Sequence, residues 1–417
     1  MHISLDSALG RQRRLNSVGE SVLQIAPNAA AAYSLRSLTG GDPKVVRVRR
    51  AIDNAESDFT AAGISSGALV NFVNQIQTLG TAVNGTGSFD NYTVSNLSTT
   101  GFSADNSAGG TGSAGFPYVF KDDDVIVVRY TVTNFSSTAS LSPQIRGVNA
   151  ISSVTGKTNS GTAFTANGTY TDTLTATADG SHLMYADGNT GSYTISDFEI
   201  VSHSSNGFVE TWYDQSGNSE DAVQETAGSQ PKIVSAGSLI VDSAGLPEID
   251  FDGSNDGLTA SSYSRSGEDL PLTMISVFNQ DVAGIDYVVA LNQTNNNAFD
   301  RILLRTDSFD YGRRATDNTS KAGSGSDPDV NTKYLFTAIN AGTTSSGFVD
   351  GSSIFSGVDT NVGTQALNQI NIGLNTGDSS ANNPFDGKMQ EIIIYETDQS
   401  DNRLALETNI NSHYSIF

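Results

Sequence analysis

The chain has 417 residues, of which 16% are charged, and it contains no cysteine. This length favours two or three domains, each large enough to bury its own core. The lack of cysteine excludes disulfide bonds, thiolate metal ligands and a cysteine nucleophile. Because no apolar stretch is long enough for a signal peptide or a membrane-spanning helix, we expect neither membrane insertion nor a secretory leader.

Charge is distributed unevenly along this chain, whose net charge is −23. Residues 1–50 carry 8 Lys and Arg against 3 Asp and Glu, which leaves 14 against 42, a net charge of −28, for all later residues. An acidic body repels phosphate groups, so nucleic acid is not an expected ligand.

The basic start, MHISLDSALGRQRRLN, combines arginines with leucines and is followed by Pro27. We expect residues 1–28 to form an arm that contacts an acidic partner, and a frayed terminus is the alternative. The residues expected to anchor the arm are Arg11, Arg13, Arg14 and Leu15.

The first regular elements are predicted between residues 32 and 80. Val46 and Val48 alternate with arginines, which is typical of a half-buried strand. Asp53 followed by Glu56 has the spacing of a capping box, which predicts a helix start. The segment SSGALVNFVNQIQTLG predicts one helix with a single apolar face, formed by Leu69, Phe72, Val73 and Ile76.

Short alternating segments follow in the middle of the chain, where Gly, Ser, Thr and Asn are abundant. VIVVRYTVTNF, GTYTDTLTATAD, SHLMYAD and YTISDFEIV predict the antiparallel strands of a small sandwich. From residue 207 onward apolar runs recur up to KMQEIIIYE, and the pair Asp350-Gly351 predicts a hairpin turn. A final helix is expected from about Ser400 through Leu404 and Ile410.

Several strings together carry a resemblance to known families. AYSLRSL, VVRVRRAIDNAESDF, GFVETWYDQSGN and PEIDFDGSNDGL resemble the N-terminal half of the catalytic domain of fungal-type α-L-arabinofuranosidase B, and they also resemble concanavalin A-like, laminin G-like modules of phage proteins. VDG and DGKMQEIIIYETDQSDNRLALETNINSHY are similar to the closing strand and terminal helix of laminin G-like jelly rolls. These matches cover roughly residues 30–80 and 207–417.

The resemblance implies an all-β fold with a discontinuous main domain. It predicts a concanavalin A-like (laminin G-like) jelly-roll sandwich over residues 29–84 and 204–417. Residues 85–203 are then an inserted second β-sandwich, which is similar to galactose-binding types of carbohydrate-binding module.

The family's hydrolases place a catalytic Glu after the strand that here reads YVVALNQTNNNAFDR. No Glu lies between Glu268 and Glu391 in this chain. Retaining glycoside hydrolysis needs two carboxyl groups about 5 Å apart. We therefore expect that the fold is kept without the arabinofuranosidase chemistry, that the protein is no enzyme, and that it has no catalytic residue.

Sugar binding uses aromatic faces together with amide, guanidinium or carboxylate groups that reach hydroxyls. Such residues occur in the stretch that matches the family's substrate-facing strands, although each is also compatible with an ordinary solvated role. The glycan-binding candidates are Tyr287, Asn292, Asn295, Arg301, Tyr311 and Arg313.

Two further motifs have structural alternatives. The oxygen-rich loop DFDGSNDG offers weak Ca²⁺ candidates in Asp252, Asn255 and Asp256, but turns of this composition are commoner than metal loops. Trp212 is predicted to be a core residue. The turn DQSG that follows it, residues 214–217, is predicted to use Asp and Gly for its geometry.

From these features we expect a phage or phage-like virion protein, such as a tail fibre, a spike or a head-attached adhesin. It would be assembled in the host cytoplasm and lie on the virion surface. The arm would contact other virion proteins, the sandwiches would bind host-surface polysaccharide, and the copies would form a homo-oligomer, with a trimer favoured. The alternatives are a capsid-decoration or baseplate protein without glycan binding, and a polysaccharide-degrading glycoside hydrolase.

Overall fold

The computed structural model describes residues 19–417, with gaps at residues 85–92, 106–111, 138–141, 148–156, 162–163, 188–190, 268–270, 294–300, 307–308, 315–319, 324, 359–365 and 375–382. Strands make up about 49% of the structure and helices about 10%, so the predicted all-β sandwich class is confirmed. In the part of the chain that is described, no helix is long and apolar enough to cross a membrane.

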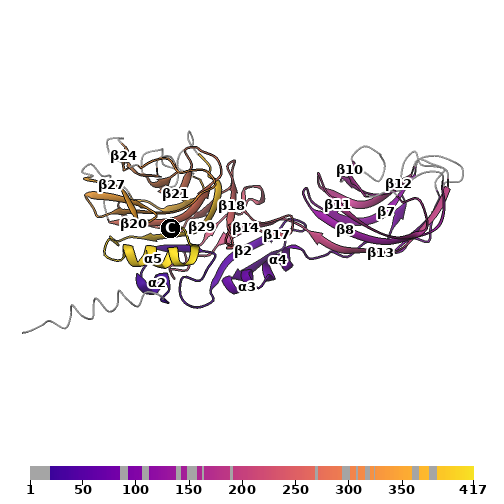
Figure 1. Ribbon diagram of the computed structural model, residues 1–417, viewed down its shortest axis with the longest axis horizontal. Coiled ribbons are helices and arrows are strands. Elements are labelled where there is room, and N and C mark those ends of the chain that lie inside the picture. The colour runs from indigo at the N-terminus through magenta and orange to yellow at the C-terminus, as the bar shows by residue number, and fades with distance from the viewer. Residues whose placement is uncertain are drawn as a thin grey trace, which may run out of the picture.

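Figure 1 shows two bodies at opposite ends of the long axis. We call the described residues from 83 to 204 the distal sandwich and the remaining described residues the main body. The main body contains both the first and the last strand, and the distal sandwich lies between α4 and β14 in the sequence.

The main body is one hydrogen-bonded system of 19 strands among the described residues. They are β1 (Ala31–Ser34), β2 (Lys44–Arg50), β3 (Glu56–Thr60), β14 (Gly207–Trp212), β15 (Ala222–Val223), β16 (Lys232–Ser235), β17 (Ser238–Leu239), β18 (Ile249–Asp252), β19 (Leu258–Ala260), β20 (Leu272–Gln280), β21 (Tyr287–Asn292), β22 (Arg301–Arg305), β23 (Asp310–Arg314), β24 (Ser320–Gly323), β25 (Lys333–Asn340), β26 (Thr344–Val349), β27 (Ser352–Val358), β28 (Gln369–Ile372) and β29 (Asp386–Tyr395).

Strand β29 is central to the main body because it pairs antiparallel with β1, β18 and β20. A register shift between Val277 and Phe278 of β20, opposite Glu391 and Met389, changes which residues of β29 face inward. Met389 before this bulge and Ile392 after it both belong to the inner core. Between them, the side chains of residues 390 and 391 lie on the outer face.

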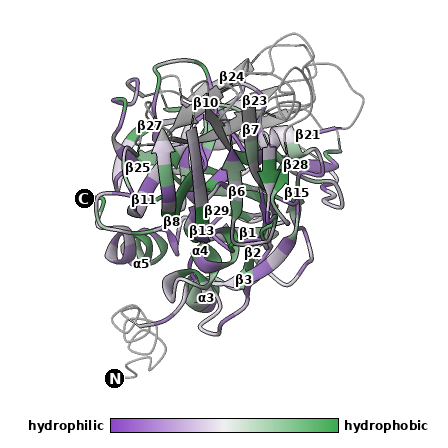
Figure 2. Ribbon diagram, turned by 90° about the vertical axis from the view of Figure 1, so that its right-hand side faces the viewer, coloured by the Kyte–Doolittle hydropathy of each residue, from purple (hydrophilic) through white to green (hydrophobic). Residues whose placement is uncertain are grey.

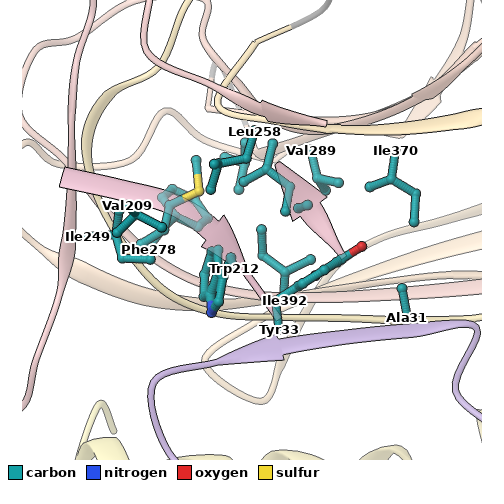
Figure 3. Close-up of a cluster of buried hydrophobic side chains, with 14 of the residues drawn as sticks. Ala31, Tyr33, Val209, Trp212, Ile249, Leu258, Phe278, Val289, Ile370 and Ile392 are labelled. Carbon is teal, nitrogen blue, oxygen red and sulfur yellow. The ribbon is translucent and has the colours of Figure 1, made fainter. Parts of the chain in front are cut away.

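The core of the main body gathers around Trp212, as predicted. This side chain is fully buried, and its ring centroid lies 5.9 Å from that of Tyr33. Figure 3 shows apolar side chains from strands far apart in the sequence around it, including Ala31, Val209, Ile249, Leu258, Phe278, Val289, Ile370 and Ile392. Burying such side chains contributes about 1.5–3 kcal/mol each.

Among the described residues, four helices lie against the main body: α2 (Val22–Ile25), α3 (Ala61–Ser65), α4 (Ala68–Val73) and α5 (Arg403–Tyr414). A 3₁₀ turn covers Ala227–Ser229. α2 and α5 enclose a second apolar cluster with β20, β25 and β29. Val22 and Ala29 are buried there. Residues 22–28 therefore pack on the main body, and this corrects the predicted arm, of which residues 1–18 lie outside the described structure.

Two helix predictions near the start of the main body were wrong. Asp53 and Glu56 cap no helix, because Asn54 adopts a φ of 59° in a hairpin turn between β2 and β3. The helix predicted through Ile76 ends at Val73 as α4. The next side chain, Asn74, bonds to the backbone of residues 205 and 237 instead, and the chain leaves toward the distal sandwich.

The distal sandwich consists of two antiparallel five-stranded sheets, with orders β10-β9-β12-β7-β4 and β11-β8-β13-β6-β5. Its strands are β4 (Val83–Asn84), β5 (Thr93–Ser95), β6 (Phe102–Asp105), β7 (Gly112–Phe120), β8 (Val125–Ser137), β9 (Ser142–Gly147), β10 (Lys157–Ser160), β11 (Gly168–Thr175), β12 (Gly180–Asp187) and β13 (Gly191–Ser204). The four strands predicted from alternating segments correspond to β8, β11, β12 and β13.

The distal sandwich has an aromatic core of its own. The rings of Phe116 and Phe198 stack with centroids 4.2 Å apart, and Tyr130 and Phe164 lie in the same cluster. Figure 2 looks along the long axis from the distal end and shows apolar residues concentrated on strands in the middle of the molecule. Each body therefore buries a separate core, which lets it be stable on its own.

The two chain crossings between the bodies lie side by side. The Asn74 amide donates to the Gly237 carbonyl oxygen (2.8 Å), and its oxygen accepts from the Ser205 N–H (3.2 Å). A Cβ placed on Gly207 would come within 2.7 Å of the Val73 side chain, so the outgoing and returning segments pack directly on each other.

Candidate functional site

Three of the predicted glycan-binding residues are buried. Tyr287, Asn292 and Tyr311 expose 2%, 2% and 1% of their surface. The Asn292 side-chain oxygen accepts from the Asn371 amide (2.8 Å) between strands β21 and β28. Tyr311 belongs to the inner core, whereas Asn292 and Asn371 lie on the opposite face of the sheet, because their neighbours Leu291, Ile370 and Ile372 are core residues. The three candidates are thus covered instead of solvent-facing, and their role in glycan binding stays a prediction.

The remaining glycan-binding candidates are not placed by the structure. Asn295 lies outside the described residues, and the side chains of Arg301 and Arg313 lie outside the described part of β22 and β23. Their role in glycan binding stays a prediction.

The oxygen-rich loop after β18 is a hydrogen-bonded turn. Asp252 Oδ1 accepts from the Ser254 N–H (2.8 Å), and Asp256 Oδ2 accepts from the Asp252 N–H (3.1 Å). The Asn255 amide donates to the Gly228 carbonyl (3.0 Å). These contacts account for the sequence of the loop, and among the described residues no group of three or more His, Asp or Glu side chains could hold a metal ion.

A line of charged and amide side chains crosses five strands on the outer face of the main body. Antiparallel pairing places Lys232 opposite Asp250, Asp250 opposite Lys388, Lys388 opposite Asn279, and Asn279 opposite Lys333. Directly opposed residues share one face of a sheet. We call these five residues the polar row.

The neighbours of the polar row in each strand fix its orientation. Ile249, Phe251, Phe278 and Met389 belong to the inner core. Because successive side chains point to opposite faces, the residues between and beside them must point outward. The row thus lies on the side of the sheet that α2 and α5 cover only in part (Figure 1).

Ion pairs connect the polar row to its surroundings. Lys388 Nζ lies 3.5 Å from Asp250 Oδ1 and also pairs with Asp281, while Lys333 pairs with Asp242. The Lys388 and Lys333 side chains are 23% and 16% exposed, so they lie recessed but reachable from solvent. Burial opposes the charge of Lys388, yet Asp281 and Asp250 raise its pKa overall.

Glu248 lies two residues before Asp250 and therefore points to the same face. It is 4% exposed, and burial raises its pKa to about 7, an effect that Lys333 and Lys388 reduce. The neighbouring Gln390 donates to Asp242 (3.3 Å) and to the Pro247 carbonyl (3.1 Å). Glu248 is therefore a carboxyl group that exchanges its proton near neutral pH.

Two buried oxygen atoms in or beside the polar row are still able to accept hydrogen bonds. Asn279 Oδ1 and Asp281 Oδ1 are buried and have no hydrogen-bond partner among the described residues. Exposed valines lie next to this end of the row: Val282 is 55% and Val330 is 42% exposed, and the Gln280 carbonyl accepts from the adjacent Asn331 N–H (2.7 Å). Donors, acceptors and apolar surface are thus combined on one face.

A hollow in the main body lies between the helices, beside the polar row. We call this cavity of about 580 Å³ the helix pocket. Its walls are mostly apolar and come from α3, α4 and the β17–β18 hairpin, with Ile64, Val70, Leu239 and Leu246 among the lining residues. Arg36, His413 and Tyr414 form its polar end.

The polar end of the helix pocket rests on a buried carboxylate. Glu391 is fully buried and accepts from Arg36 Nε (2.7 Å) and Arg36 Nη2 (3.0 Å). The Ser34 hydroxyl (2.9 Å) and the Tyr414 hydroxyl (3.1 Å) donate to the same carboxylate. This charge is therefore fully paired, as a buried ion must be.

A buried histidine with two side-chain partners occurs in the distal sandwich. His203 Nε2 lies 2.8 Å from Asp124 Oδ2, and the Tyr118 hydroxyl lies 2.9 Å from His203 Nδ1. Asp124 and His203 are 0% and 2% exposed. With no access from solvent, this group ties the ends of β7, β8 and β13 together and offers no surface for a substrate.

Sequence reasoning missed both the polar row and the helix pocket. The five residues of the row come from strands as far apart as residues 232 and 388, so no short stretch of sequence contains them all. The alternation in PEIDFDG and in the start of DGKMQEIII was the available signal, since it places Glu248, Asp250 and Lys388 on outward positions.

Comparison with known proteins gives structural neighbours only. No family model matches the chain, and no curated protein matches it. The carbohydrate-binding module of a Ruminococcus gnavus IT-sialidase, bound to α2,3-sialyllactose, is similar at 13% identity and a TM-score of 0.29, covering 33% of this chain and 81% of that chain.

Two longer neighbours match about half of this chain. The binding domain of Paraclostridial Mosquitocidal Protein 1 has 14% identity and a TM-score of 0.36, covering 48% of this chain and 49% of that chain. A GH54 α-L-arabinofuranosidase soaked with a cyclic sulfate inhibitor has 17% identity and a TM-score of 0.35, covering 49% and 51%. The chain spans about half the length of these two proteins, and likeness at this level carries no conclusion about function.

Proposed function

We propose that the protein binds glycans without hydrolysing them and that the polar row is its binding surface. The observation that carries this proposal is the register that aligns Lys232, Asp250, Lys388, Asn279 and Lys333 on one recessed face. A sugar ring presents several hydroxyls in a plane, and each can donate and accept a hydrogen bond. A flat row of ammonium, carboxylate and amide groups matches that pattern.

The free acceptors add to this argument. Asn279 Oδ1 and Asp281 Oδ1 have no partner among the described residues, and a buried acceptor without a donor is costly. Two exposed valines, Val282 and Val330, flank this end of the row and suit the apolar face of a sugar ring. Both features favour a polyhydroxylated ligand over a simple ion.

The test is binding of the full chain to an immobilised array of neutral, acidic and amino-sugar oligosaccharides. We expect Asp250→Asn and Lys388→Met to weaken binding about 10-fold to 100-fold, because a hydrogen bond to a charged group contributes about 1.5–3 kcal/mol. Lys121→Met is the matched control, since Lys121 forms a similar ion pair with Asp179 in the distal sandwich. Equal loss in all three variants, or no binding by the parent chain, would overturn the proposal.

We further propose that the protein acts on a virus particle, to which its N-terminal segment attaches it. The basic residues Arg11, Arg13 and Arg14 precede a strongly acidic remainder, which suits an acidic partner surface. Deleting residues 1–18 is expected to abolish incorporation into particles while leaving the main body folded. Unchanged incorporation would refute this role.

Glu248 favours glycoside hydrolysis as a second candidate function. A carboxyl group with a pKa of about 7 can serve as a general acid, and the carboxyl groups of Asp250 and Asp281 lie in its surroundings. Hydrolysis of the bound glycan that disappears in Glu248→Gln, with glycan binding retained, would establish this candidate. Binding without any turnover in the parent chain would refute it.

A further inference from the structure

The helix pocket is large enough to hold a ligand, and its walls are mostly apolar. Its volume of about 580 Å³ lies within the range of pockets that hold small molecules or a few side chains. Ala62, Ile64 and Val70 form one wall, and Leu239 and Leu246 contribute to the opposite one. An occupant must therefore present aliphatic groups.

The polar end of the helix pocket does not favour a small anion. The guanidinium of Arg36 is bound by Glu391 through two nitrogens and donates from Nη1 to the Asn409 side chain (3.0 Å). Its ring contact with Tyr414 occupies one face of the guanidinium. Since the charge of Arg36 is already compensated, the apolar walls decide what binds.

Residues 1–18 join the described chain at Gly19, close to the rim of this pocket. The Asn409 amide donates to the Glu20 carbonyl oxygen (2.6 Å), and the same Asn409 side chain accepts from Arg36, which lines the pocket. The four residues from Gly19 back to Leu15 span up to about 14 Å when extended. Leu15 is the leucine nearest in sequence to this junction.

The sequence of residues 1–18 supplies suitable side chains. Its aliphatic residues include Ile3, Leu5, Leu9, Leu15 and Val18. The pocket rim carries a carboxylate of opposite charge to the arginines that follow Leu9, since Asp42 accepts from the N–H of the lining residue Ala62 (3.3 Å). Apolar and charged features of the segment therefore both have counterparts at the pocket.

We propose that residues 1–18 bind the helix pocket of their own chain, with Leu15 inserted first. The tether at Glu20 gives the segment a high effective concentration at the pocket, so modest contacts suffice. This site concerns the same segment that we propose as an anchor, and docking stores it against the main body before assembly. Docking of this segment does not depend on glycan binding.

Because the chain has no cysteine, an introduced pair reports directly on this contact. In the full chain, Asn16→Cys is combined with Ser65→Cys on the pocket wall, and disulfide formation is followed under mild oxidation. The control pair is Asn16→Cys with Thr39→Cys, an exposed position that does not line the pocket. We expect the pocket pair to cross-link at least about tenfold faster than the control pair.

Two further variants test the pocket and the leucine separately. Leu15→Asp and Ala62→Trp, each added to the pocket pair, are expected to slow its cross-linking to the rate of the control pair. Equal rates for both pairs in the parent background would overturn the proposal. Cross-links that join two chains and grow with protein concentration would overturn docking within one chain and assign the pocket to a second copy.

Discussion

Asp256 illustrates how burial changes the chemistry of a single residue. It lies in the turn that we considered for Ca²⁺, is 6% exposed, and accepts from the Asp252 N–H. Burial raises the pKa of Asp256 to about 7, and the nearby charge of Asp252 adds to the effect. Between about pH 4 and pH 7 the folded protein therefore holds a proton here that the unfolded chain has lost.

We predict that Asp256→Asn stabilises the main body at pH 8 and has little effect near pH 4. For a carboxyl group whose pKa is raised by folding, the free energy of unfolding falls as pH rises from about 4 to about 7 and then stays constant. A shift of about three pKa units corresponds to at most about 4 kcal/mol. Urea unfolding followed by the fluorescence of Trp212, the only tryptophan, measures the effect.

Calcium provides the control for this prediction. An ion bound at the turn would hold Asp256 in its charged form, and millimolar Ca²⁺ would then stabilise the parent chain but not Asp256→Asn. We expect equal unfolding midpoints with and without Ca²⁺ in both proteins. A Ca²⁺-dependent rise in the parent alone would contradict the assignment of this loop as a hydrogen-bonded turn.

The surrounding sequence predicted burial correctly for some single residues and not for others. The alternation around Trp212 sufficed to predict a core residue. The run YVVALN, in contrast, has no polar alternation, because β21 is buried on both sides. Tyr287 and Asn292 therefore resembled surface ligands in sequence although both are buried.

The turn at residues 214–217 is the clearest case of an element stabilised by its own sequence, as predicted. Asp214 Oδ1 accepts from the N–H of Ala32 (2.8 Å) and of Ser216 (2.8 Å), and Gly217 has a φ of 93°. The Gln215 side chain accepts from the Leu38 N–H (2.8 Å). The turn thus binds the segment after β1, which has few backbone partners of its own.

Replacing Gln215 by Leu should destabilise the main body by about 3–5 kcal/mol. The change leaves three buried backbone groups without partners, since Gln215 also donates to the carbonyls of Ser34 and Arg36, and each unsatisfied group costs about 1–3 kcal/mol. Asn218→Ala removes a more exposed amide from the same turn and should cost about 1 kcal/mol. Equal losses, measured by urea unfolding, would contradict this account.

At the level of elements, the strands were more predictable than the helices or the site. The Asp350-Gly351 turn was confirmed, with φ values of 50° and 76° at its two positions. α4 ends before its apolar sequence pattern does, because the side chain of Asn74 bonds to the backbone of a residue distant in sequence. The polar row could not be predicted in the same way, since it depends on the pairing of five strands.

The attachment of the distal sandwich to the main body leads to a prediction for the whole molecule. The two crossings meet where Asn74 bonds to Ser205, and each body has a separate core. Replacing residues 76–204 by a short Gly-Ser linker should therefore leave the main body folded. We expect Trp212 fluorescence to report an unchanged urea midpoint.

The control for this excision is a deletion within the main body. Removing β29, which pairs with three other strands, should abolish cooperative unfolding altogether. A main body without the distal sandwich that also lost cooperative unfolding would show that the two bodies stabilise each other.

The position of β29 also determines the order in which the protein can form during translation. Every strand of the distal sandwich has been synthesised by residue 204, whereas β1 must wait for residues 391–394 before it finds its partner. For nearly half of synthesis the main body is thus a ribosome-bound chain with unpaired apolar strands beside a completed neighbour. Its solubility in that interval depends on the acidic residues between its strands, which repel one another and other nascent chains.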